Sequence, residues 1–224
     1  LASLTATGQE DMHTAFKPLP VGFKYVNFND VYALKKAVNK NTCAILLEVI
    51  QGEGGVNAIT PEFVAAINTL QKQEDVLVIV DEIQTGIGRT GTMFAFQQTT
   101  LNPDIITLAK GLGGGLPIGA VVAKDQVADH FKPGDHGTTF GGNPLATAAG
   151  NYILSAIEDQ QLLKNVKVIS AYIKDQVQSW QSPIIEEVRG QGFLIGLKVT
   201  KPVAQVIAAA ADQGLLVTSA KDNV

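Results

Sequence analysis

The stretch Val76-Leu77-Val78-Ile79-Val80-Asp81-Glu82 is an apolar run of strand length that ends in two carboxylates. A run without a polar residue inside it is typical of a strand that is buried on both faces, as in a parallel sheet. Similar runs occur at residues 43–49, 105–109 and 119–123. Segments of helical period lie between some of these runs. The alternation predicts an α/β fold with a mostly parallel sheet, flanked by helices, in which these runs are central strands.

The helical segments have recognisable start signals and apolar spacing. Thr60 and Pro61 are typical of a helix N-cap and a first helical position, and apolar residues recur at helical spacing over residues 63–70. Later helices are predicted over residues 145–158, 162–180 and 202–213, with strand-like segments around residues 188 and 194–199. This change of pattern predicts that residues 1–159 belong to a large domain and that residues 160–224 begin a smaller α+β domain.

The composition excludes several classes of partner. Seventeen Lys and Arg residues against 21 Asp and Glu residues give a net charge of −4, and no basic cluster occurs, so nucleic acid is not expected as a partner. No apolar run approaches the ~20 residues of a membrane helix, so no membrane span is expected. Cys43 is the only cysteine and lies beside an apolar run. We therefore expect it to be buried, without a disulfide, in a protein of the reducing cytoplasm.

The common catalytic motifs are absent or lie in the wrong context. The segment 86–91 matches G-x-G-x-x-G, but five residues separate it from the preceding strand, and the next strand ends in Lys110 where a dinucleotide site needs an acidic residue. No P-loop lysine motif, G-x-S-x-G, H-E-x-x-H or C-x-x-C is present. His13, His130 and His136 lack the spacing of metal ligands, so no metal is expected.

Lys110 stands out because it follows a predicted strand and precedes the glycine-rich segment 111–115. Asp81 ends a neighbouring predicted strand. Because ligands of α/β sheets bind beyond the carboxyl ends of the strands, the amine and the carboxylate should face one crevice. This pair suits pyridoxal 5′-phosphate: a lysine can bond to the cofactor's aldehyde, and a carboxylate keeps the ring nitrogen protonated so that the ring accepts electrons.

With these residues in place, the chain resembles the class III pyridoxal-phosphate-dependent aminotransferases, and within them the enzymes that act on N-acetylornithine. The motifs that carry the resemblance lie at residues 48–55, 81–86, 89–91, 110–115 and 136–144. The resemblance implies a pyridoxal-phosphate transferase of fold type I, with the large domain binding the cofactor. It also implies a cytoplasmic homodimer with shared active sites.

The resemblance assigns a role to each matching position. Lys110 would bond to the cofactor and move the proton during catalysis, and Asp81 would pair with the ring nitrogen. Gln84 would donate a hydrogen bond to the phenolic oxygen of the cofactor. Thr139, with Thr138 beside it, would bind the cofactor phosphate of the other subunit. Taken without the family, Gln84 and the two threonines would be read as polar loop residues.

Two glutamates precede these residues in the chain. The resemblance implies that Glu53 pairs with a substrate-binding arginine, and so excludes or admits glutamate and 2-oxoglutarate; a helix-capping acid is the alternative. Glu48 reads equally well as a site residue or as a carboxylate at the edge of the core. Val49 replaces the proline that is usual between the glutamate and the isoleucine of this motif, which affects the stiffness of the loop and not its chemistry.

The reaction implied is ping-pong transamination, in which N-acetylornithine gives its terminal amino group to 2-oxoglutarate and N-acetylglutamate semialdehyde and glutamate are formed. Ornithine, succinylornithine and 4-aminobutyrate aminotransferases share the fold and stay as alternatives. A further alternative is a scaffold or oligomerisation module without catalysis. The sequence starts without Met at Leu1 and stops at Val224, soon after a strand-like run at residues 215–217. We therefore expect an internal fragment. Because the resemblance implies further cofactor- and substrate-binding motifs before Leu1 and after Val224, we expect this chain alone to be poorly folded or inactive.

Overall fold

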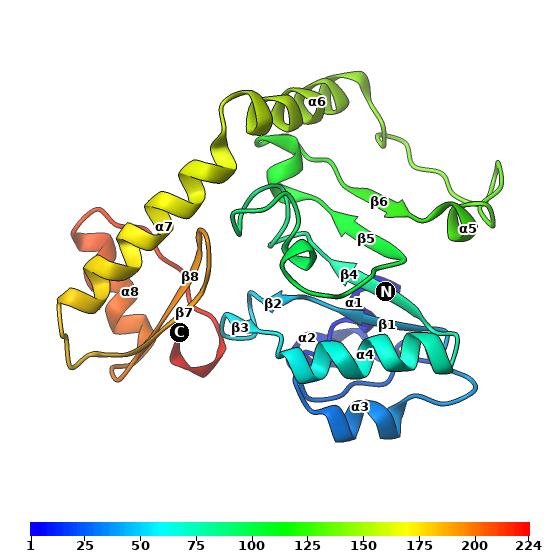
Figure 1. Ribbon diagram of the computed structural model, residues 1–224, viewed down its shortest axis with the longest axis horizontal. Coiled ribbons are helices and arrows are strands. Elements are labelled where there is room, and N and C mark those ends of the chain that lie inside the picture. Colours follow the sequence, from blue (N-terminus) through cyan, green and yellow to red (C-terminus); the bar gives the residue numbers. More distant parts are fainter.

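A computed structural model describes all residues, 1–224, and places a four-stranded sheet at the centre of the longer part of the chain (Figure 1). The strand order is β1-β4-β5-β6, formed by Ala44–Leu47, Leu77–Asp81, Ile105–Leu108 and Ala120–Ala123. The pairs β1·β4 and β4·β5 are parallel, and β5·β6 is antiparallel. This confirms the predicted α/β class with a mostly parallel sheet.

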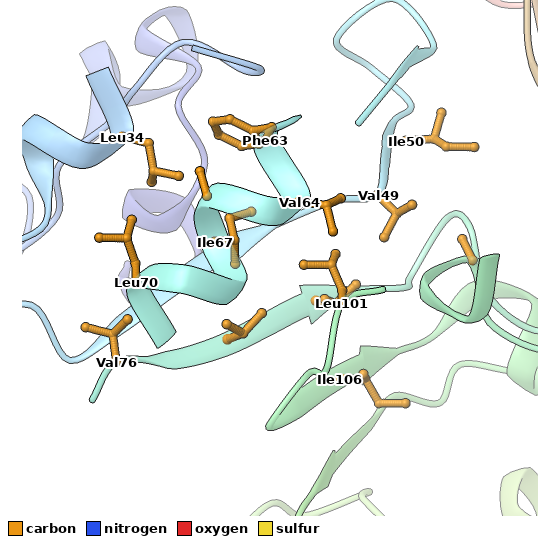
Figure 2. Close-up of a cluster of buried hydrophobic side chains, with 14 of the residues drawn as sticks. Leu34, Val49, Ile50, Phe63, Val64, Ile67, Leu70, Val76, Leu101 and Ile106 are labelled. Carbon is orange, nitrogen blue, oxygen red and sulfur yellow. The ribbon is translucent and has the colours of Figure 1, made fainter. Parts of the chain in front are cut away.

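Helix α4 (Pro61–Gln73) covers one face of this sheet (Figure 2). Thr60 caps it by accepting a hydrogen bond from the backbone N–H of Phe63 at 3.3 Å, as the sequence predicts. The buried face of the helix packs onto alternate residues of the strands, because successive strand side chains point to opposite faces. The core labelled in Figure 2 consists of Leu34, Val49, Ile50, Phe63, Val64, Ile67, Leu70, Val76, Leu101 and Ile106.

Two of the four predicted central strands are the edges of the sheet. In β1, Leu46 is 44% exposed, and in β6, Val121 is 72% exposed. Strand β6 also runs antiparallel, because only residues 109–119 connect it to β5 and a parallel neighbour needs a crossover of a dozen or more residues. The prediction that the runs at 43–49 and 119–123 are central strands was therefore wrong.

Two other sequence-based expectations also fail. Cys43 is exposed, because it lies just before edge strand β1 and not within the buried core. Residues 215–217 form no strand, and their apolar side chains are exposed. An apolar run becomes a strand only where a neighbouring strand pairs with it, and in this structure nothing pairs with residues 215–217.

Short elements precede and flank the sheet. They are α1 (Ala2–Ala6), α2 (Glu10–His13), η1 (Thr14–Phe16), α3 (Val31–Ala37), β2 (Ile50–Gln51), β3 (Asn57–Ala58), η2 (Ala95–Gln98), η3 (Lys110–Gly113) and α5 (Asp125–Ala128). Strands β2 and β3 form a small antiparallel pair next to the main sheet. No helix combines the length and the apolarity that crossing a membrane requires.

The C-terminal part consists of two long helices followed by a hairpin (Figure 1). Its elements are α6 (Pro144–Asp159), α7 (Leu162–Ser179), the antiparallel strands β7 (Ile185–Gln191) and β8 (Leu194–Val199), α8 (Val203–Asp212) and η4 (Lys221–Asn223). The sequence therefore predicts α6, α7 and α8 to within a residue or so. The division of the chain into domains at residues 159 and 160 stays a prediction.

A buried carboxylate ties the helix and strands together. One oxygen of Asp104 accepts hydrogen bonds from the Val78 backbone N–H at 2.9 Å and from Gln71 Nε2 at 2.7 Å, and the other accepts from Lys124 Nζ at 2.9 Å. Burial acts to raise the pKa of Asp104, but the hydrogen bonds from Val78, Lys124 and Gln71 outweigh it, so that the pKa lies below its ordinary value of 3.8. Asp104 therefore joins α4, β4 and the end of β6.

We expect Asp104→Asn to lower the free energy of unfolding by about 2 kcal/mol, because the amide has one acceptor oxygen for three donors. A lowered pKa in the folded state stabilises the protein above the unfolded pKa, and this contribution is lost as the pH falls through the folded pKa. The variant should therefore lose part of the wild-type decline below about pH 4. Urea unfolding at pH 7 and pH 3 checks both effects. Equal destabilisation at the two pH values would contradict the electrostatic part.

Candidate active site

The site lies at the carboxyl ends of β4 and β5. Asp81 is the last residue of β4 and pairs in register with Thr107 of β5. Three residues after Thr107, Lys110 begins the 3-10 helix η3 with a positive φ of 45°. Because β4 and β5 are parallel, the carboxylate and the amine emerge at the same edge of the sheet, as the sequence predicts. A left-handed backbone at a residue other than glycine is a strained conformation that is often found at functional sites.

The orientation of Asp81 is fixed by two donors to one of its oxygens. Oδ1 accepts from the backbone N–H of Ile83 at 2.9 Å and from the hydroxyl of Thr107 at 3.1 Å. Oδ2 accepts no hydrogen bond from the chain. The carboxylate is therefore held by its own strand end and by the neighbouring strand, with one oxygen left for a ligand that carries a positive N–H group.

The Lys110 side chain is exposed, and its amine makes no hydrogen bond or ion pair within the chain. Lys110 also borders a cavity of about 250 Å³ between the segment Gln84–Arg89 and the junction of α6 with α7. Apolar side chains, among them Ile87 and Phe193, line most of this cavity, and Asp81 does not reach it. This cavity is therefore bordered by Lys110 but not by Asp81.

Glu48 belongs to the same group of charges. Its carboxylate follows β1 and accepts the backbone N–H of Gly52 at 3.1 Å. Burial raises the pKa of Glu48, the Gly52 hydrogen bond opposes the rise, and the negative charge of Asp81 adds to it. The charges of Lys110 and Glu53 act on this carboxyl as well. Because β1 is the parallel neighbour of β4, Glu48 lies at the same edge of the sheet as Asp81, which favours the reading as a site residue that the sequence leaves open.

Glu53 and Gln84 contact each other at the rim of the site. Glu53 lies in the turn between β2 and β3, and its Oε1 accepts from Gln84 Nε2 at 3.4 Å. Gln84 folds over Gly52, where a Cβ would come within 1.3 Å of its amide oxygen. No helix follows Glu53 directly, so the alternative of a helix-capping acid fails. The hydrogen bond from Gln84 to a cofactor stays a prediction.

Glu82, next to Asp81 in the chain, is a buried structural carboxylate that the sequence-based predictions leave without a role. Its side chain is fully buried and accepts hydrogen bonds from the Thr85 hydroxyl and from the backbone N–H groups of Ala95 and Phe96. Burial raises the pKa of Glu82, against the opposing effect of these three bonds. The alternation of strand side chains is the signal that separates the two acids: Asp81 faces the crevice and Glu82 faces the interior.

Thr138 and Thr139 are not brought to the other site residues. Both lie in the exposed segment between α5 and α6. Because β6 runs antiparallel to β5, this segment begins at the end of the sheet opposite to Lys110, and from α5 it runs back to α6 (Figure 1). Neither threonine hydroxyl makes a hydrogen bond to another site residue, so the binding of a cofactor phosphate by Thr138 and Thr139 stays a prediction.

A carboxylate and a lysine at the carboxyl ends of neighbouring strands suit a pyridoxal-phosphate transferase of fold type I, and the comparisons with known proteins place the chain in this class. The chain belongs to the class III aminotransferase family, which matches residues 1–224. It is 48% identical to the acetylornithine aminotransferase of Caldanaerobacter subterraneus subsp. tengcongensis, over 99% of this chain and 57% of that protein. It is 45% identical to the acetylornithine aminotransferase of Bacillus subtilis, over 100% of this chain and 58% of that protein.

Solved structures give the same fold. The ornithine aminotransferase of Toxoplasma gondii matches with a TM-score of 0.91 and 35% identity, over 98% of this chain and 54% of that one. The N-acetylornithine aminotransferase of Stenotrophomonas maltophilia matches with a TM-score of 0.80 and 38% identity, over 90% of this chain and 54% of that one. The chain thus spans little more than half the length of the relatives it matches.

Proposed function

We propose that this chain forms the cofactor site of a transaminase that transfers the terminal amino group of N-acetylornithine to 2-oxoglutarate. The observation that carries the proposal is the placement of Asp81 and Lys110 at one edge of the sheet. Asp81 is held by two hydrogen bonds to Oδ1, and Lys110 has no partner within the chain. Membership of the class III family implies pyridoxal phosphate as the cofactor. The curated relatives at 43–50% identity, which are named acetylornithine aminotransferases, support this amino donor.

The residues of this chain fit pyridoxal phosphate. Asp81 Oδ2 is left for a protonated ring nitrogen, and Lys110 Nζ is left for an aldehyde carbon. When bound, the cofactor supplies an aldehyde that takes up the amino group and a ring that delocalises the electrons of the deprotonated carbon. Lys110 Nζ would hold the cofactor through its aldehyde carbon, with water lost, until the amine of the donor takes its place on that carbon; the freed Nζ would then accept the proton from the amine-bearing carbon of the donor. Asp81 keeps the ring nitrogen protonated.

The remaining assignments concern substrate and subunit. Glu53 pairs with a substrate-binding arginine when the donor carries one carboxylate, and moves away when glutamate brings a second. Thr138 and Thr139 bind the cofactor phosphate of a second copy, which makes a homodimer necessary for activity. The exposed position of their segment supports this. The cytoplasmic location expected from the composition stays a prediction.

Ornithine is the second candidate for the amino donor. One observation favours it: the structure of an ornithine aminotransferase matches this fold with a TM-score of 0.91. The test uses the purified full-length protein with pyridoxal phosphate and 2-oxoglutarate, and measures glutamate formed from N-acetylornithine, ornithine or 4-aminobutyrate. We expect kcat/KM for N-acetylornithine to be about tenfold or more above the others. A preference for ornithine would overturn the donor assignment. No glutamate from any donor would overturn the transaminase assignment.

A further inference from the structure

The turn that carries Glu53 has a strained backbone. Gly55 has a φ of 103°, and the buried Val56 has a φ of 52°. A β-branched residue in the left-handed region costs about 1–3 kcal/mol and persists only where its surroundings impose it. The two short strands that flank the turn, β2 and β3, pair only through four residues. The conformation of the turn must therefore be imposed from elsewhere in the chain.

Arg189 of β7 reaches this turn from more than 130 residues away in the sequence. Its Nη1 donates to the backbone oxygen of Gly55 at 3.0 Å and to Asn57 Oδ1 at 3.0 Å. Asn57 in turn donates through Nδ2 to the backbone oxygen of Gly54 at 2.7 Å. The Arg189 side chain is only 16% exposed, and its Nε is held by Glu187 at 2.7 Å. A fixed guanidinium thus spans the turn just after Glu53.

The hairpin of β7 and β8 also packs against the turn. Val56 lies against Gly190 of β7 and Gly196 of β8, where an added Cβ would come within 2.7 and 2.8 Å of the valine side chain. On the other side, the backbone N–H of Lys221 donates to the backbone oxygen of Glu53 at 3.0 Å. Figure 1 shows β7 and β8 beside β3. The backbone of the turn that carries Glu53 is therefore held by the C-terminal part of the chain in addition to its own short strands, while the Glu53 side chain contacts Gln84.

We propose that Arg189 is a positioning residue which holds the Gly52–Asn57 turn so that Glu53 discriminates between the two substrates. The proposal rests on the proposed function, in which N-acetylornithine carries one carboxylate and glutamate carries two. A carboxylate held at the rim favours the first substrate and repels the second carboxylate of glutamate. If the turn loosens, Glu53 moves away from the rim. The pairing of Glu53 with the substrate-binding arginine is then lost, and this pairing is needed for N-acetylornithine but not for glutamate.

The test compares the two half-reactions in the cofactor-loaded full-length protein. Arg189→Lys keeps the charge, but its single Nζ on a flexible chain would have to serve Glu187 and both acceptors of the turn, which the planar guanidinium meets with two separate nitrogens. We expect kcat/KM for the N-acetylornithine half-reaction to fall about tenfold and that for glutamate to stay unchanged or to rise, because the repulsion of its second carboxylate weakens. Asn57→Ala removes one acceptor of the same clamp and should shift the ratio in the same direction. Hydrogen exchange of the amides at residues 55–57 should become faster in both variants.

Glu187→Gln is the matched control, because it weakens the outer partner of Arg189 and leaves both bonds to the turn in place. We expect both half-reactions to stay within about twofold of wild type in this variant. An equal loss in both half-reactions, or an unchanged ratio in Arg189→Lys and Asn57→Ala, would overturn the positioning role. If the wild-type protein performs neither half-reaction, the proposed function fails instead, whatever the hydrogen exchange shows.

Discussion

Lys110→Ala is expected to reduce transamination by about 10⁴-fold or more, because one substitution removes both the covalent attachment point and the group that moves the proton. We expect the backbone conformation at position 110 to stay unchanged. Alanine keeps the Cβ, so the left-handed φ of 45° at this position is no harder to adopt than before. The amine has no partner within the chain, so its removal leaves no donor or acceptor unpaired. Single-turnover kinetics with N-acetylornithine check the result.

Lys110→Arg separates chemistry from charge. The guanidinium stays positive and keeps the electrostatic effect on Glu48, but it does not lose its proton at neutral pH and so cannot act as the nucleophile. We expect a loss as large as in the alanine variant, with unchanged thermal unfolding in both. Mass mapping after borohydride reduction should find a phosphopyridoxyl group on Lys110 of the wild type alone. A phosphopyridoxyl group at position 110 of either variant, or near-normal turnover in either variant, would contradict the assignment of this lysine.

The sheet shows how far periodicity leads. The apolar runs of β4 and β5 predict buried strands correctly, because both are covered by neighbours on either side. The runs at β1 and β6 are equally apolar, yet these strands lie at the two edges of the sheet and have exposed apolar side chains. The apolar character of a run does not tell whether a second strand pairs with its outer side. The antiparallel direction of β6 was readable, since the eleven residues 109–119 are too few for a helical crossover.

The site divides in a similar way. Asp81 and Lys110 could be placed together from sequence, because strand ends of parallel neighbours meet at one edge. Glu48 could have been assigned on the same ground, as it follows the parallel strand β1. The clamp of Arg189 on the Glu53 turn could not be foreseen, because it joins residues 132 and 134 positions apart through the packing of a separate hairpin. Such contacts depend on how two sheets meet, which local pattern does not encode.

Asp81→Asn is expected to lower turnover by about 10³-fold, or about 4 kcal/mol of transition-state stabilisation. Asparagine keeps an oxygen that can accept from the Ile83 N–H and the Thr107 hydroxyl, so the side chain should stay in place. What is lost is the negative charge that keeps the ring nitrogen protonated, and with it the ability of the ring to accept electrons from the donor carbon. The cofactor should still attach to Lys110, because that bond does not require the charge.

Thr107→Val is the matched control for this prediction. It removes one of the two donors to Oδ1 and leaves the carboxylate and its charge, so we expect a loss of only about threefold to tenfold. If positioning by the strand ends were the whole role of Asp81, Asp81→Asn would lose no more activity than Thr107→Val, since asparagine keeps the accepting oxygen and Thr107→Val removes one of its two donors. A gap of about two orders of magnitude between them, with cofactor attached in both, is the result that only an electrostatic role produces. Near-normal turnover in Asp81→Asn would contradict that role outright.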